Sequence, residues 1–171
     1  MPSCLPNDLS SQILPDSARV YRLIEVPGHF DPDAGDKHPK IQAFVPSTDD
    51  IDEAVAKNWQ SPGLTVWNSA GAEPADARAL MKNPKPRVAI EASVGDIHAI
   101  SDSAGQQVFA VVASPLVGDA RAGAGGHCSL FGLPCDSRTL QWRAPELKDK
   151  RRELAKVFKD VIWTPPALAP A

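Results

Sequence analysis

The sequence is poor in features that crosslink a protein or anchor it in a membrane. Its 171 residues include only three cysteines, an odd number that leaves no complete disulfide framework. Residues 1–15 lack the charged and then apolar pattern of a secretory signal. The densest apolar run, residues 108–117, is far shorter than the roughly 20 residues that span a bilayer. We therefore expect a soluble, cytoplasmic protein with no membrane partner.

A surplus of positive charge is also lacking. The chain has 18 basic and 21 acidic side chains, which argues against a protein that coats nucleic acid, because phosphate binding is driven by Lys and Arg. The charge is uneven, however: residues 1–80 carry 6 basic and 12 acidic groups, whereas residues 81–171 carry 12 and 9. A local basic face is compatible with this distribution. Nucleic acid is therefore a partner that we do not favour.

Aromatic residues are few, at 6%, but 43% of the residues are apolar, and a chain of this length buries a core without a metal or disulfides. The 17 prolines lie between apolar stretches, which is typical of a globular domain with stiff connections. We expect an N-terminal lead segment at residues 1–17, a single domain at residues 18–163 and a Pro/Ala-rich tail at residues 164–171.

Periodicity and turn residues predict the elements. Strands are expected at residues 18–26, 41–45, 64–67, 88–94, 107–113 and 129–133. Helices are expected after Pro46, at residues 74–82 and at residues 146–160, the last with Val161 on its apolar face. The expected fold is α+β: a single domain with a mixed, mostly antiparallel sheet of about five or six strands and two or three helices packed on one face.

No complete catalytic set is present, and His127 is the most informative single residue. It lies where a Gly-rich loop meets a short apolar strand, and an imidazole titrates in the range that suits general acid–base catalysis. Together with His98 and a cation such as Arg121 or Arg138, it would cleave a phosphodiester without a metal. The alternative is a structural histidine that bonds a loop carbonyl.

Metal and cofactor motifs fail in their spacing. Residues 31–36 resemble a calcium loop but lack its glycine at the sixth position and glutamate at the twelfth. The Gly-rich residues 118–127 lack the Lys and Ser/Thr of a phosphate loop. Cys128 and Cys135 lack the closely paired ligands of a zinc site. We expect neither a metal nor a cofactor.

Candidate binding residues come from a basic linker and from aromatic anchors. Residues 82–87 are extended by their prolines and carry Lys85 and Arg87, while Trp67 and Arg138 are further candidates for an interface. The leading hypothesis is a cytosolic, bacterial-type interaction or binding module with a protein partner, in a setting such as a toxin–immunity or phage-defence system. The alternative is a small metal-independent hydrolase or nuclease with His127 as general acid and base. The sequence leaves open whether the protein is an enzyme.

Overall fold

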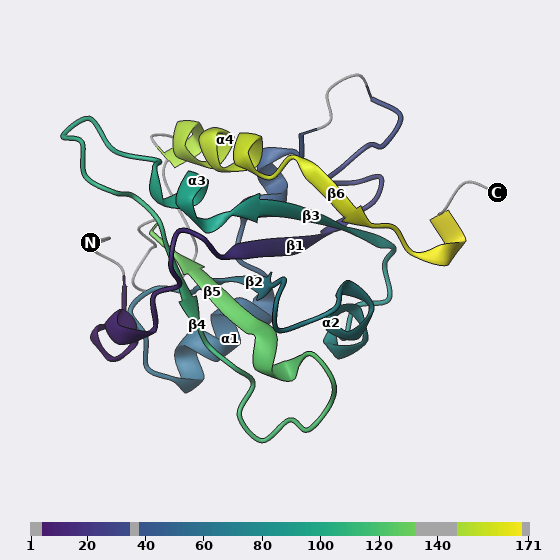
Figure 1. Ribbon diagram of the computed structural model, residues 1–171, viewed down its shortest axis with the longest axis horizontal. Coiled ribbons are helices and arrows are strands. Elements are labelled where there is room, and N and C mark those ends of the chain that lie inside the picture. The colour runs from purple at the N-terminus through teal and green to yellow at the C-terminus, as the bar shows by residue number, and fades with distance from the viewer. Residues whose placement is uncertain (1–4, 35–37, 133–146, 169–171) are drawn as a thin grey trace.

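Six antiparallel strands form one open sheet in the computed structural model, which describes residues 5–34, 38–132 and 147–168 (Figure 1). Their order across the sheet is β4-β5-β2-β1-β3-β6. The strands are β1 (Arg19–Glu25), β2 (Leu64–Asn68), β3 (Arg87–Ser93), β4 (Ala110–Ala113), β5 (His127–Phe131) and β6 (Asp160–Trp163). The expected α+β fold with a single antiparallel sheet is confirmed.

Helices cover both faces of this sheet because the strands are apolar on both sides. In β1, Val20 and Ile24 lie on the face covered by α3 (Val94–His98) and α4 (Leu147–Val157). Tyr21 and Leu23 lie on the opposite face, where α2 (Pro74–Leu80) packs. On that same side, α1 (Thr48–Ala56) packs over β4 and β5. The sequence predicted helices on one face only, whereas the structure also has α1 and α2 on the second face.

The first turn of α1 is fixed by a capping box. The Ser47 hydroxyl accepts a hydrogen bond from the backbone N–H of Asp50, and the Asp50 carboxylate accepts one from the backbone N–H of Ser47. These two bonds satisfy donors that the helix itself leaves free. The helix start predicted after Pro46 is confirmed.

The prediction of a strand at residues 41–45 is wrong. This segment forms a 3-10 helix, Ile41–Phe44, whose Phe44 is fully buried against Phe158 with 5.2 Å between the ring centroids. The segment lies on a face of the sheet and not at its edge, so its backbone has no strand to pair with. A short turn satisfies the backbone locally and leaves the Phe44 side chain free to fill the core.

The helix predicted at residues 146–160 is too long at its C-terminal end. Helix α4 ends at Val157, and the chain then enters the sheet as β6, which pairs with β3. Val161 is consequently 45% exposed instead of packed inward. The backbone groups on the outer edge of β3 need partners, and β6 supplies them.

Residues 5–17 cover the opposite edge of the sheet. A 3-10 helix, Asn7–Gln12, is followed by Ile13, which forms an isolated bridge to Val112 of β4. The backbone N–H of Leu14 donates to the carbonyl of Val111 over 2.8 Å. The edge strand β4 is thereby covered by the chain's own N-terminal segment.

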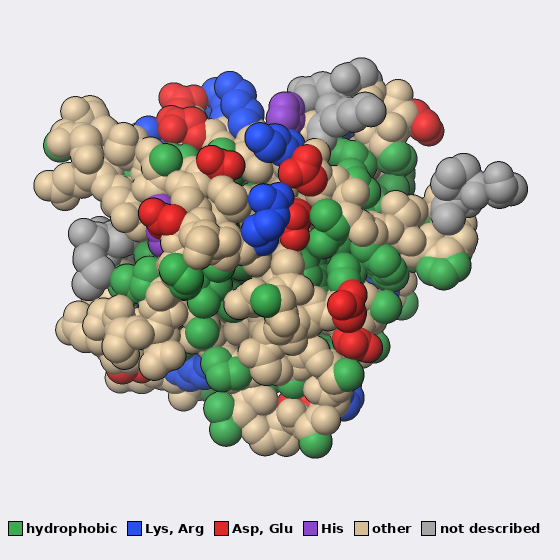
Figure 2. Space-filling model, in the orientation of Figure 1, with side chains coloured by type: hydrophobic (Ala, Val, Ile, Leu, Met, Phe, Trp, Pro, Cys, Tyr) green, Lys and Arg blue, Asp and Glu red, His purple; other side chains and the backbone are tan. Residues whose placement is uncertain are grey.

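Charged side chains of both signs are mixed on the surface seen in Figure 2. Ion pairs accompany the basic side chains elsewhere in the described structure: Arg19 pairs with both Glu91 and Asp160. This mixture argues against a continuous basic patch on that face of the molecule.

Candidate functional site

A cleft of about 750 Å³ lies over β1 and β2, between the start of α1 and the segment that joins α2 to β3. One wall is cationic and includes Arg22, Lys82 and Arg87. The other wall is acidic and includes Asp49, Asp50 and Glu53. Apolar and aromatic side chains between the walls include Leu23, Trp67, Met81 and Leu116.

The cleft exists because β1 and β2 separate. They pair only at Val20↔Asn68 and Tyr21↔Trp67, whereas β1 pairs with β3 along its whole length. Beyond Tyr21 the two strands diverge, and the Arg22 side chain occupies the opening. Because β1 does not pair with Thr65, the backbone carbonyl of Thr65 is free to accept from Arg22 and its N–H is free to donate to Asp50.

Backbone carbonyls hold Arg22 in this opening. Its Nε donates to the carbonyl of Ala43 over 2.7 Å, and its Nη1 donates to the carbonyl of Thr65 over 2.5 Å. Among the described residues, no carboxylate lies within ion-pairing distance of it. Burial lowers the pKa of Arg22 to about 10, against the opposing charge of Asp50, so the side chain stays protonated at neutral pH. Arg22 is thus a fixed positive charge that senses the charge of Asp50 but forms no ion pair with any described carboxylate.

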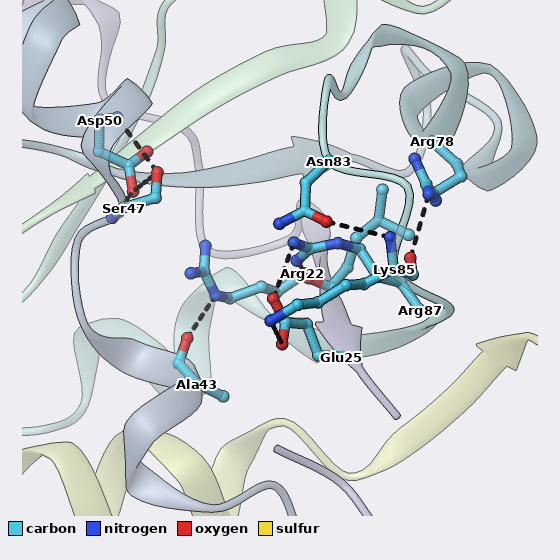
Figure 3. A network of polar contacts seen from close by, with 10 residues as sticks. Arg22, Glu25, Ala43, Ser47, Asp50, Arg78, Asn83, Lys85 and Arg87 are labelled. Carbon is cyan, nitrogen blue, oxygen red and sulfur yellow. Dashed lines mark hydrogen bonds and ion pairs between the residues drawn. The ribbon is translucent and has the colours of Figure 1, made fainter. Parts of the chain in front are cut away.

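A second cationic group lies nearby and is partly neutralised. Arg87 and Lys85 each contact one oxygen of Glu25 over 3.2 Å (Figure 3). Burial opposes ionisation of Glu25, but the hydrogen bond from Lys85 and the charge of Arg87 outweigh it and lower the pKa of this carboxyl. Arg87 also donates to the carbonyl of Leu23, and its Nε is buried without a partner in the described structure. Two cations therefore share one carboxylate.

The acidic wall is tied to the sheet through Asp50, which is only 2% exposed. One of its oxygens accepts hydrogen bonds from the backbone N–H and the hydroxyl of Ser47. The other accepts from the backbone N–H of Thr65 over 3.1 Å and from its hydroxyl over 2.5 Å. The Asp50 carboxylate thus accepts four hydrogen bonds, two at each oxygen, and it links the start of α1 to Thr65 of β2.

His127 lies at the inner end of the cleft and is 5% exposed. Its Nδ1 donates to the carbonyl of Ser114 over 2.8 Å, because that oxygen can only accept. Its Nε2 is 3.4 Å from the hydroxyl oxygen of Thr65, and its ring meets that of Trp67 edge to face at 5.1 Å. Burial lowers the pKa of His127, against the charge of Glu53, so the imidazole is neutral at pH 7.

The other residues predicted from the sequence lie in different surroundings. His98 contacts Asp16 over 2.7 Å and does not line the cleft. Arg121 lies in the exposed loop between β4 and β5, where it pairs with Asp119. Arg138 lies outside the described residues. The structure therefore brings His127, Trp67 and Arg87 together, with Lys85 beside them, but not His98 or Arg121.

Sequence reasoning missed three residues that organise the cleft: Arg22, Asp50 and Thr65. A signal was present for Arg22, since alternation along β1 places it on the same face as Val20 and Ile24. A cation is rarely found on an apolar strand face unless it has a partner. Asp50 carried only the signal of a helix cap. Nothing in the sequence distinguishes Thr65 from an ordinary strand residue.

The fold and the site together define an α+β protein with a cleft of mixed charge. No protein-family model matches this chain, and comparisons with curated proteins and with solved structures likewise give no significant match. In the described part of the chain, no helix has the length and apolar character needed to cross a membrane. Nor do the described residues include a group of three or more side chains placed to hold a metal ion.

Proposed function

We propose that this protein is a binding module whose cleft receives the anionic group of a small molecule. The observation that carries the proposal is the Arg22 guanidinium, which lines the cleft and is held by two carbonyls without a described carboxylate partner. A carbonyl holds a cation in place but does not neutralise its charge. The charge of Arg22 is therefore available to a ligand.

The neighbouring ion cluster supports the same function. Arg87 and Lys85 share Glu25, so these three side chains keep one net positive charge. On the opposite wall, Glu53 is already paired with Lys57. A guanidinium also has the geometry for phosphate or carboxylate, because its N–H groups match two oxygens at once.

The test is a titration of the folded protein with inorganic phosphate, followed by amide NMR shifts. Arg22→Gln is expected to weaken binding at least tenfold, about 1.4 kcal/mol, because a charged hydrogen-bond donor is lost. Arg22→Lys keeps the charge but not the forked arrangement of donors. Its affinity for phosphate is expected to lie between those of the native protein and Arg22→Gln. Arg121→Gln is the matched control, since Arg121 is an exposed arginine outside the cleft. Equal affinities in all four proteins would overturn the proposal.

A hydrolase is the second candidate, and one observation favours it. Because Nδ1 of His127 donates to Ser114, the lone pair of its neutral imidazole is on Nε2, the nitrogen nearer to Thr65. Such a nitrogen accepts a proton from water or a hydroxyl in general base catalysis. The residues expected to assist it, His98 and Arg121, do not line the cleft.

Hydrolysis of an activated phosphodiester separates the two candidates. If the protein is a hydrolase, His127→Gln loses the activity while His98→Gln keeps it. If the native protein hydrolyses the phosphodiester no faster than buffer does, the hydrolase is rejected and the binding module is the remaining candidate. The expected protein partner and the toxin–immunity or phage-defence setting stay predictions, because nothing in the fold or the site bears on them.

A further inference from the structure

We propose that the ligand of this cleft is a phosphorylated sugar, whose phosphate binds the cationic wall and whose hydroxyl groups bind the side formed by α1. This inference rests on the anion site proposed above and adds the chemical class of the ligand. It follows from the opposite chemistry of the two walls.

The α1 side of the cleft is unsuited to a bare anion. It presents the hydroxyls of Ser47 and Thr48 and the carboxylates of Asp49 and Glu53. Carboxylates repel a second anion but accept hydrogen bonds from hydroxyl groups. Figure 3 shows this separation: Ser47 and Asp50 lie on one side, with the Glu25–Arg87 pair on the other. A ligand that fits both sides is anionic at one end and rich in hydroxyl donors at the other.

Hydroxyl groups already bind a carboxylate on this wall. Asp50 accepts the hydroxyls of Ser47 over 2.9 Å and of Thr65 over 2.5 Å. Two further carboxylates of α1 keep free acceptor oxygens: Asp49 is exposed without a partner in the described structure, and Glu53 uses only Oε1 for Lys57. These oxygens are the acceptors that sugar hydroxyls would use.

Two other ligand classes fit less well. A nucleotide base stacks on an open aromatic face, but Trp67 is only 3% exposed and its ring meets His127 edge to face. An amino acid carries an ammonium group close to its carboxylate, so a carboxylate bound to Arg22 would place that positive charge beside the cationic wall. A sugar phosphate has its charge at one end and its hydroxyls along the rest of the molecule, and a cleft of about 750 Å³ has room for it.

The experiment compares calorimetric affinities of ribose 5-phosphate and inorganic phosphate. We expect ribose 5-phosphate to bind at least about tenfold more tightly than phosphate to the native protein. In the double variant Asp49→Asn/Glu53→Gln, the advantage is expected to fall below about threefold, while phosphate binding is not weakened. Asp52→Asn, an exposed α1 acid that does not line the cleft, is the control that keeps the full advantage.

The outcomes separate the two proposals. Equal binding of ribose 5-phosphate and phosphate overturns the sugar class but leaves the anion site intact. The sugar class is also overturned if AMP binds more tightly than ribose 5-phosphate and does so equally in the double variant, because the base then supplies the affinity. Phosphate binding that does not respond to Arg22→Gln removes the anion site itself, and the inference falls with it.

Discussion

At the scale of single residues, Arg22 and His127 are both desolvated ionisable groups, and they respond differently to burial. Arg22 keeps its charge because even a pKa lowered to about 10 is far above neutral pH. His127 loses its charge because its ordinary pKa, about 6.5, is close to neutral and burial lowers it further. The cleft therefore has a permanent cation on one side and a neutral imidazole at its inner end.

The neutral imidazole predicts a defined pH dependence of stability. Above the ordinary histidine pKa, both the folded and the unfolded state hold His127 neutral, so it contributes nothing to the pH dependence. As the pH falls from about 6.5 toward the lower pKa of the folded state, only the unfolded state gains a proton, and the free energy of unfolding decreases. Each pKa unit between the two states corresponds to about 1.4 kcal/mol.

Urea denaturation between pH 7.5 and pH 5 measures this effect. We expect the free energy of unfolding to fall less steeply with acidification in His127→Gln than in the native protein. Burial also lowers the pKa of His29. Because His29 is present in both proteins, its contribution to the slope cancels in the comparison. Identical slopes would contradict the assignment of His127 as a histidine held neutral by burial.

At the scale of elements, α1 connects the helix cap to the cleft. Ser47→Ala removes the side-chain acceptor for the Asp50 N–H and is expected to destabilise the protein by about 1 kcal/mol. Thr48→Ala is the matched control, because Thr48 is an exposed hydroxyl residue without a hydrogen bond in the described structure, and it is expected to change stability by less than about 0.5 kcal/mol. Chemical denaturation of both variants measures the difference, and equal effects would argue against the capping box.

The end of α4 gives a second prediction at this scale. Phe158 is fully buried against Phe44, so Phe158→Ala is expected to lower the free energy of unfolding by about 3–5 kcal/mol. Val161 is 45% exposed on β6, so Val161→Ala is expected to lower it by less than about 1 kcal/mol. If the helix continued through residue 160 and packed Val161 inward, as the sequence pattern suggested, Val161→Ala would instead lower it by about 1.5–3 kcal/mol.

Elements defined by local signals were predictable, and those defined by tertiary partners were not. The cap at Ser47, the proline at the start of α2 and the alternating residues of β1 and β3 are local, and the structure has these elements where they were expected. Tertiary partners determine the conformation of two other segments, residues 41–44 and 160–163. The prediction of a strand in the first segment and of a helix end in the second was wrong. Apolar content alone does not distinguish a turn over the core from an edge strand.

At the scale of the whole molecule, the cleft joins parts of the chain that are far apart in sequence. Arg22 comes from β1, Asp50 from α1, Thr65 from β2, Arg87 from β3 and His127 from β5. Sequence analysis selected His127, Arg87 and Trp67 one by one, but it had no basis for placing them together. The grouping follows from the strand order, which places β5, β2, β1 and β3 side by side, and from the divergence of β1 from β2.

The location of a bound anion tests the central claim most directly. A crystal structure of the protein with ribose 5-phosphate is expected to have the phosphate within hydrogen-bonding distance of Arg22 and close to Arg87, between α1 and the segment before β3. A phosphate bound instead along the basic side chains of α4, with the cleft occupied only by water, would contradict the assignment of this cleft as the functional site.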